Sequence, residues 1–285
     1  MVESTSLLTR QGVKTLEGSN PSVSAVRTYY RHDLHAYDYG ARLLRFLNVR
    51  YNRKHSMDTF EKQYDKTAEE FNEFYDNQEA HVSTDAFFSV ITNEIISDIA
   101  NKKVLDLGCG AGKDAVFYTQ KGFAYSGVDA SAEMCAMAKQ DNNVSDIRNE
   151  SFSQKMSFGS KEFGLIVSKY AIQTAQDIKP IYDEVYRLLD DRGYFAFLVV
   201  HPMRQFIEKK KQGKDYFKKE LVESIIFDGK ITVTEASHTL SEYLNSDFLN
   251  NFSLIDIKEG YDFPASEQVN GDIYPTFLII VAQKK

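Results

Sequence analysis

A glycine-rich turn between an apolar strand and a helix is the feature that most constrains how this chain folds. Residues 104–114 read VLDLGCGAGKD, a short apolar run followed by glycines at 108, 110 and 112. Short apolar runs bounded by glycine are typical of buried strands in a parallel sheet. Glycine has no Cβ, so Gly108, Gly110 and Gly112 let the backbone turn tightly and approach a ligand. The turn therefore predicts a ligand site at the N-terminal end of a helix.

The details of the turn disfavour a dinucleotide as this ligand. The spacing is G-x-G-x-G, and Lys113 stands where a dinucleotide-binding G-x-G-x-x-G has its last glycine. Asp106 lies two residues before the first glycine. A carboxylate there would repel a pyrophosphate, but it would accept hydrogen bonds from an α-ammonium group. Asp129 closes the next apolar run at the spacing where an acid binds ribose hydroxyls, and Ser131 is predicted to cap the helix that follows.

Together these features resemble the first motif, D-x-G-x-G-x-G, and the second strand of class I S-adenosylmethionine-dependent methyltransferases of the small-molecule type. The resemblance covers about residues 60–285. It implies an α/β fold with a Rossmann-like, doubly wound sheet of seven strands, the last antiparallel, with N-terminal helices and an inserted cover after the fifth strand. It implies S-adenosyl-L-methionine as the cofactor, bound by Asp106, Gly108, Cys109, Gly110, Gly112, Asp129, Ala130, Ser131, Met134, Ser153, Ser168 and Tyr170. Phe152-Ser153 departs from the acid-plus-small pair that relatives often have after the third strand.

The pattern along the chain predicts how the remaining segments are organised. We expect a tail and a helical lid or arm in residues 1–57, the methyltransferase domain in 58–285, and a substrate cover in 202–238. Alternating strands and helices indicate a parallel sheet. Helices are expected over 58–76, from Ser83 and over 177–189, with a stop at 191–193. The third to seventh strands are expected near 144–149, 163–168, 194–200, 252–258 and 276–282, and the Asp-Gly pair at 228–229 predicts a hairpin in the cover.

Methyl transfer needs close positioning of donor and acceptor, and a hydroxyl acceptor also needs a base. The segment from Tyr64 to Phe71 resembles the family's Y-D-x-x-A-x-x-Y/F, in which the tyrosine lies over the methionine end of the cofactor. His201 directly follows the fifth strand and is our first candidate for a base, and His238 is the next. The alternatives are a half-buried helix aromatic for Tyr64, a core or surface side chain for His201, and a helix start for His238.

The charge distribution bears on the partner. The net charge is −7, yet residues 1–57 carry nine Lys and Arg against four Asp and Glu, so the rest of the chain is acidic. An acidic surface disfavours phosphate backbones. We therefore expect a small-molecule methyl acceptor, with nucleic acid unlikely as a partner. The alternatives are an RNA or protein methyltransferase that uses the basic N-terminal arm, and a non-catalytic, cofactor-binding regulatory protein.

The remaining expectations concern metals, location and assembly. His32 and His35 are three residues apart, but no carboxylate cluster completes a site, so no metal is predicted. No apolar run approaches the length of a membrane span, and the first residues lack the features of a secretory signal. Both cysteines, Cys109 and Cys135, fall in the proposed cofactor unit without zinc-type spacing. We expect a cytoplasmic protein that is a monomer or a homodimer.

Overall fold

The structure, a computed structural model, describes residues 62–76, 82–140, 144–208, 213–227, 230–262 and 273–285. The chain divides into two units, Met1–Arg53 and Lys54–Lys285, and all described residues belong to the second unit. The predicted tail and lid or arm, and the two histidines near the N-terminus, lie outside the described residues. The domain boundary expected after residue 57 therefore stays a prediction.

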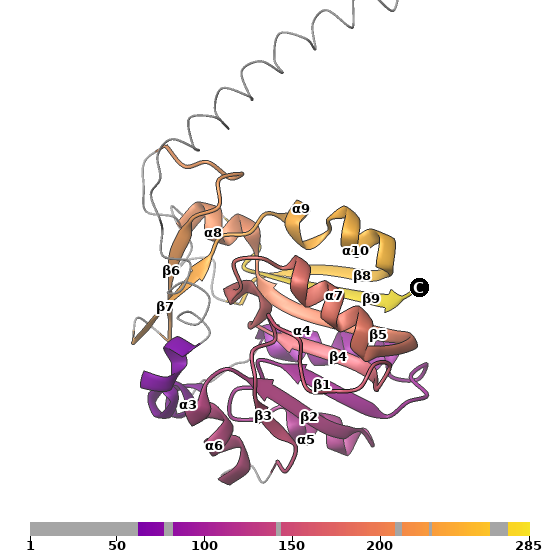
Figure 1. The fold of residues 1–285 in the computed structure, drawn as a ribbon. Coiled ribbons are helices and arrows are strands. Elements are labelled where there is room, and N and C mark those ends of the chain that lie inside the picture. The colour runs from indigo at the N-terminus through magenta and orange to yellow at the C-terminus, as the bar shows by residue number, and fades with distance from the viewer. Residues whose placement is uncertain (1–61, 77–81, 141–143, 209–212, 228–229, 263–272) are drawn as a thin grey trace, which may run out of the picture. The chain divides into compact units, whose positions relative to one another are not determined.

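Seven strands form one sheet in the order β3-β2-β1-β4-β5-β9-β8 (Figure 1). The strands from β3 to β5 pair in parallel, whereas β9 runs antiparallel to both β5 and β8. This confirms the predicted Rossmann-like α/β fold with its last strand antiparallel. The order reverses between β1 and β4, and open sheets bind ligands at the carboxyl ends of strands at such a point. The strands are β1 (Lys103–Leu107), β2 (Ala124–Asp129), β3 (Ile147–Asn149), β4 (Phe163–Lys169), β5 (Leu189–Val200), β8 (Phe252–Gly260) and β9 (Phe277–Lys284).

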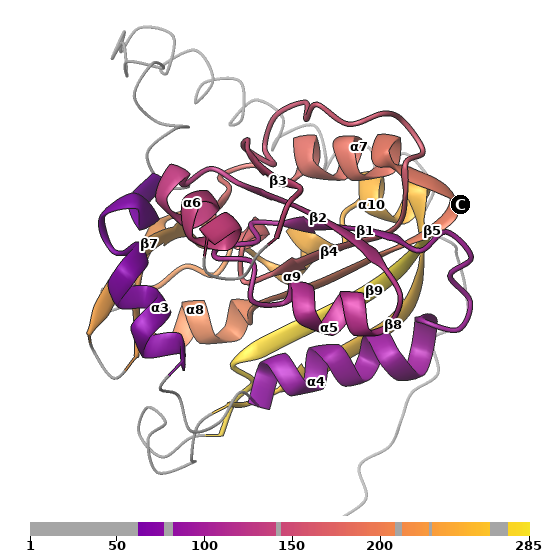
Figure 2. The same cartoon turned by 90° about the horizontal axis from the view of Figure 1, so that it is seen from below.

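Helices cover both faces of the sheet (Figure 2). One face packs against α4, η2, α5 and α6, and the other against α7 and α10. Side chains alternate along β1, so Val104 is buried on the first face and Leu105 on the second. The helices on the two faces are α4 (Val82–Val90), the π-helix η2 (Ile91–Ile95), α5 (Ala115–Gln120), α6 (Ala132–Gln140), α7 (Lys179–Leu188) and α10 (Ser246–Asn251).

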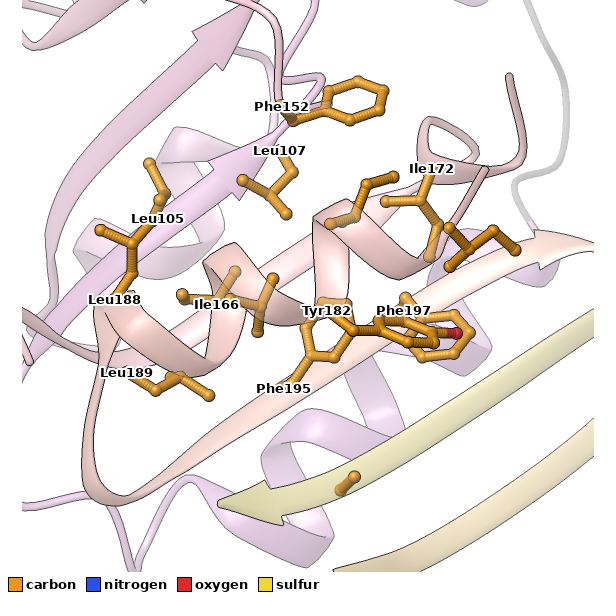
Figure 3. Close-up of a cluster of buried hydrophobic side chains, with 14 of the residues drawn as sticks. Leu105, Leu107, Phe152, Ile166, Ile172, Tyr182, Leu188, Leu189, Phe195 and Phe197 are labelled. Atoms are coloured by element: carbon orange, nitrogen blue, oxygen red, sulfur yellow. The ribbon is translucent and has the colours of Figure 1, made fainter. Parts of the chain in front are cut away.

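Large side chains fill the space between the sheet and α7 (Figure 3). Leu105 of β1, Ile166 of β4 and Phe195 of β5 are fully buried there. Tyr182 of α7 packs against the Phe195 ring, and its hydroxyl donates to the carbonyl of Tyr243 at 2.9 Å. Closely packed interiors resist deformation, so the strands hold the loops at their carboxyl ends in fixed positions.

Two predicted boundaries differ from the structure. The helix expected over 177–189 with a stop at 191–193 ends at Leu188, because Leu189 already pairs with Phe163 as the first residue of β5. Arg192, within the predicted stop, has a positive φ of +66°. The helix expected over 58–76 is divided, in its described part, into η1 (Lys62–Lys66), a 3-10 helix, and α3 (Ala68–Asp76).

The chain leaves the sheet after β5 and forms the cover. A short helix, α8 (Pro202–Glu208), precedes an antiparallel pair, β6 (Leu221–Ile226) and β7 (Ile231–Ala236), which confirms the predicted hairpin. The chain returns to the sheet through α9 (Leu240–Tyr243), whose capping box uses Thr239 and Glu242. No helix among the described residues is long and apolar enough to cross a membrane.

Candidate cofactor and acceptor site

The turn after β1 holds its glycines in conformations that other residues disfavour. Gly108 and Gly110 have φ angles of +73° and +52°. A Cβ on Gly108 would lie 2.2 Å from the Cβ of Ala171, so this glycine lets the turn pack on the segment after β4. A Cβ on Gly110 would meet only the sulfur of Met134, at 4.0 Å. The backbone at Gly110 therefore borders space that a ligand can enter.

Asp129 joins the end of β2 to this turn. Its carboxylate accepts hydrogen bonds from the backbone N–H groups of Gly110 and Ser131, each at 2.9 Å. The Ser131 hydroxyl accepts the N–H of Met134 at 3.2 Å, which confirms the predicted N-cap of α6. The same hydroxyl donates to Asp65 of η1 at 2.6 Å. These bonds fix the Asp129 carboxylate beside the glycine turn and tie η1 to it.

Asp106 of β1 is buried close to the same turn. Only 4% of its surface is exposed, and its Oδ2 accepts the hydroxyl hydrogen of Tyr125 at 2.8 Å. Burial, helped by the negative charge of Asp114, raises the pKa of Asp106 to about 7. The hydrogen bond from Tyr125 and the positive charge of Lys169 lower this pKa in part. A further positive charge close to the carboxylate would lower it more. The position therefore favours a ligand that brings a cation.

A buried ion pair next to Asp106 was not predicted from the sequence. Lys169, at the end of β4, lies 2.8 Å from the carboxylate of Asp114, and both side chains are largely buried. Lys169 also donates to the hydroxyl of Tyr75 in α3 at 3.0 Å. The sequence could have indicated this pair. Lys169 ends a parallel strand and Asp114 follows the glycine turn, and both positions lie at the same edge of the sheet.

Tyr64 of η1 lies between the turn and the cover. Its ring packs with Ala111 and Met134. Burial raises the pKa of the Tyr64 hydroxyl, and the charges of Glu235 in β7 and of Asp129 raise it further. Tyr64 is therefore near a carboxylate of the turn and a carboxylate of the cover, and at neutral pH its hydroxyl keeps its proton.

Gln63 ties η1 to the hairpin of the cover. Its amide nitrogen donates to the carbonyl of Thr234 at 3.0 Å, and its amide oxygen accepts the N–H of Thr234 at 2.8 Å. The side chain thus pairs with β7 as a neighbouring strand would. No local pattern predicts this contact, because the two residues are 171 positions apart.

Glu235 is the centre of a second set of bonds in the cover. Its carboxylate accepts hydrogen bonds from the amides of Gln173 after β4, at 2.8 Å, and of Gln205 in α8, at 3.0 Å. The Ser224 hydroxyl of β6 donates at 2.7 Å. Only 1% of the surface of Glu235 is exposed. The sequence predicted a hairpin in this region but no role for Glu235.

His201 follows β5 as predicted, and both of its ring nitrogens are engaged. Nδ1 accepts the N–H of Met203 at 2.9 Å, so the proton of a neutral ring lies on Nε2, which is 2.7 Å from Glu259. Burial lowers the pKa of His201, although its hydrogen bond with Glu259 acts in the opposite direction. A role as a base requires one of these bonds to open, and it stays a prediction.

His238 is buried where the cover returns to the sheet. Its Nε2 lies 3.1 Å from the carbonyl oxygen of Gln173 and 3.0 Å from that of Ala175. Its Nδ1 lies 3.4 Å from Glu242. His238 therefore holds the segment after β4 against the cover, and its proposed catalytic role also stays a prediction.

Two of the remaining predicted residues lie at the carboxyl end of β4: Ser168 is within the strand, and Tyr170 directly follows it. The hydroxyl of Ser168 donates to the carbonyl of Leu107 at 3.1 Å, which ties this end of β4 to the glycine turn. Tyr170 has a φ of +54°, and strain of this kind in a non-glycine residue is frequent at functional sites. Ser153 lies on another segment, after β3, where its N–H donates to the hydroxyl of Ser151 at 3.1 Å.

Three further predicted residues lie close to the turn. The thiol of Cys109 lies 3.6 Å from the carbonyl oxygen of Gly110, and burial raises the pKa of this thiol. Ala130 is buried, and its carbonyl oxygen accepts a hydrogen bond from Asn149 at 2.9 Å. Gly112 has a φ of +73°. Within the described part of the chain, no three His, Cys, Asp or Glu side chains are placed to hold a metal ion.

The comparisons with known proteins agree with this geometry. Residues 105–197 match the methyltransferase domain family. The malonyl-[acyl-carrier protein] O-methyltransferase of Enterobacter lignolyticus (strain SCF1) is 26% identical over 132 residues, covering 44% of this chain and 52% of that protein. The chain spans about half the length of the curated relatives it matches.

Solved structures show the same fold. A Listeria monocytogenes protein, assigned provisionally as an S-adenosylmethionine-dependent methyltransferase, has a TM-score of 0.57 and 22% identity, covering 71% of this chain and 99% of its own. The [4+2]-cyclase SpnF has a TM-score of 0.55 and 13% identity, covering 78% and 94%. Residues 105–197 thus carry a methyltransferase domain, and the sheet order is that of the fold shared with these solved structures.

Proposed function

We propose that this protein transfers a methyl group from S-adenosylmethionine to nitrogen or oxygen of a small molecule, by in-line displacement. The bound cofactor supplies an electrophilic methyl group on a sulfonium centre. One observation carries the proposal: η1 is hydrogen-bonded through Asp65 to Ser131 beside the glycine turn and through Gln63 to Thr234 of the cover. A cofactor held at the turn and an acceptor held under the cover would then be neighbours, as a displacement requires.

The residues of the turn fit the cofactor. The space beside Gly110 admits a ligand close to the backbone. Asp129, fixed at the end of β2, would accept hydrogen bonds from the ribose hydroxyls. Asp106 is buried with a raised pKa and would gain most from a positive neighbour, so it would bind the α-ammonium group.

The cover favours a small acceptor. Hydrogen bonds from η1, from the segment after β4 and from α8 hold β7 in place. A cover tied on three sides would exclude water from the reacting groups. The proposed setting is the cytoplasm, which agrees with two free cysteines, Cys109 and Cys135.

The alternatives rest on other parts of the chain or on the fold alone. An RNA or protein acceptor would need the basic segment of residues 1–57, which lies outside the described residues. A non-catalytic role is compatible with the fold, because a fold does not specify a reaction.

Calorimetry with S-adenosylmethionine, S-adenosylhomocysteine and NAD tests the cofactor half of the proposal. We expect micromolar binding of the first two and none of NAD. Formation of S-adenosylhomocysteine is then measured with pools of small amines and alcohols, with transfer RNA and with protein. Binding of NAD alone, or methylation of RNA or protein only, would refute the proposal.

A further inference from the structure

Glu235 differs from the other buried acids of the described residues, which are Asp106, Asp129 and Glu184. Glu184 forms an ion pair with Arg187, and the two aspartates belong to the proposed cofactor site. Glu235 is more deeply buried than any of them, and it has no Lys, Arg or His partner within ion-pair distance in the part of the chain that the structure describes.

The orientation of the two amides shows that Glu235 accepts their hydrogen bonds. The oxygen of Gln173 accepts the N–H of Val200 at 2.6 Å, and the oxygen of Gln205 accepts the N–H of His238 at 3.0 Å. Since each amide oxygen is taken by a backbone donor, each NH2 group must face the carboxylate. Gln173 and Gln205 are therefore positioning residues for an acceptor-only carboxylate.

Neutral donors satisfy the hydrogen-bonding capacity of a buried carboxylate only in part, and they bring no opposite charge. Buried charges in proteins are usually paired, because the cost of removing them from water is otherwise large. Glu235 follows Thr234, which Gln63 of η1 binds, and its charge raises the pKa of Tyr64 in the same element. We therefore assign Glu235 to the acceptor side of the proposed site. A cationic group of the acceptor would supply the missing charge through a charge-assisted hydrogen bond.

We propose that Glu235 selects acceptors that carry a positively charged nitrogen, such as an ammonium, guanidinium or imidazolium group. The inference rests on the proposed function and names the class of its substrate. Glu235 acts here in recognition, by binding a cationic group of the acceptor.

Matched pairs of acceptors test this selection. Tyramine and histamine are each compared with the alcohol of the same skeleton, and S-adenosylhomocysteine formation gives kcat/KM. Both members of each pair keep a second nucleophile, the phenol oxygen or an imidazole nitrogen, which can accept the methyl group while the ammonium keeps its proton at Glu235. We expect the amines to be the better substrates. Glu235→Gln should lower kcat/KM for amines by about 10- to 100-fold, the range for one charge-assisted bond, and leave the alcohols little changed. Glu223→Gln, which removes an exposed carboxylate from β6, is the matched control and should change neither.

The affinities for S-adenosylmethionine and S-adenosylhomocysteine separate the two proposals. If the wild type binds neither, the proposed function fails. If it binds both, but the alcohols equal the amines or no amine reacts, the selection by Glu235 is wrong and the cofactor proposal stands. A Glu235→Gln protein that loses affinity for the sulfonium alone would show that Glu235 pairs with the cofactor, which also overturns the inference. If Glu235→Gln does not fold, the ratio of wild-type kcat/KM for each amine and its matched alcohol tests the selection by itself.

Discussion

The glycine turn and the cover reach the same edge of the sheet by different means. The turn is built from one stretch of chain, and its main contacts are backbone N–H groups held by Asp129 and a glycine packed on Ala171. The cover is held by side-chain amides from separate elements, among them Gln63 and Gln205. The proposed cofactor half is thus defined by local backbone geometry, whereas the proposed acceptor half depends on long-range side-chain contacts. Substitutions should therefore affect the two halves differently.

The largest effect is expected for Gly108→Ala. The new Cβ would overlap the Cβ of Ala171 at a φ of +73°. Left-handed backbone strain and overpacking together should cost roughly 2–5 kcal/mol of unfolding free energy. Denaturant unfolding of the ligand-free protein measures this. Gly110→Ala, at a similar φ but beside open space, should cost less stability and instead weaken cofactor binding. Equal losses of unfolding free energy in the two variants would contradict the proposed difference between the packed position at Gly108 and the open one at Gly110.

Asp106→Asn should stabilise the ligand-free protein at neutral pH and weaken S-adenosylmethionine binding. Burial raises the pKa of Asp106 to about 7. Above about pH 4 the unfolded carboxyl loses its proton while the folded one keeps it, so wild-type stability falls until about pH 7 and then levels off. The advantage of the asparagine should therefore grow over this range to about 2–4 kcal/mol.

Thermal unfolding of both proteins between pH 4 and pH 8 checks this expectation. Tyr125 can still donate to the asparagine oxygen, so the variant keeps the observed hydrogen bond. An advantage that does not change with pH would show that the charge of Asp106 is not the cause.

Asp129→Ala should weaken binding of S-adenosylhomocysteine by about 1.5–3 kcal/mol, the range for hydrogen bonds to a charged group. Calorimetry measures the change. The variant also frees the N–H groups of Gly110 and Ser131, so Asp129→Asn, which keeps an oxygen for these donors but removes the charge, is measured beside it. An unchanged affinity in Asp129→Ala would mean that the ribose is bound elsewhere.

The smallest effect, and the one most specific to the cover, is expected for Gln63→Ala. The loss of two hydrogen bonds to Thr234 should weaken acceptor binding by about 1–2 kcal/mol, which is measured as a higher KM for the acceptor. The cofactor affinity should change little, because Gln63 is not part of the turn. Hydrogen exchange at the backbone amides of β7 gives an independent readout. Faster exchange in β7 with unaltered exchange in β2 is expected, whereas equal acceleration in both would show that the two halves are not separate.

The sequence determined the fold and the cofactor half of the site. Alternating strands and helices predicted a parallel sheet, and the resemblance to class I methyltransferases implied its seven strands. The spacing of Asp106, Gly108 and Asp129 marked the turn that the structure shows at the carboxyl ends of β1 and β2. Such features are local: a glycine at a positive φ and an acid at a strand end depend on neighbouring residues, so a short stretch of sequence carries them.

The cover was decided by tertiary structure. The Asp-Gly pair predicted a hairpin, but the pairing of Gln63 with β7 and the burial of Glu235 join residues far apart in the chain. His201 likewise contacts two different elements, through Met203 and through Glu259. Polar side chains such as these follow no periodicity, and their partners depend on where the folded sheet brings separate segments together.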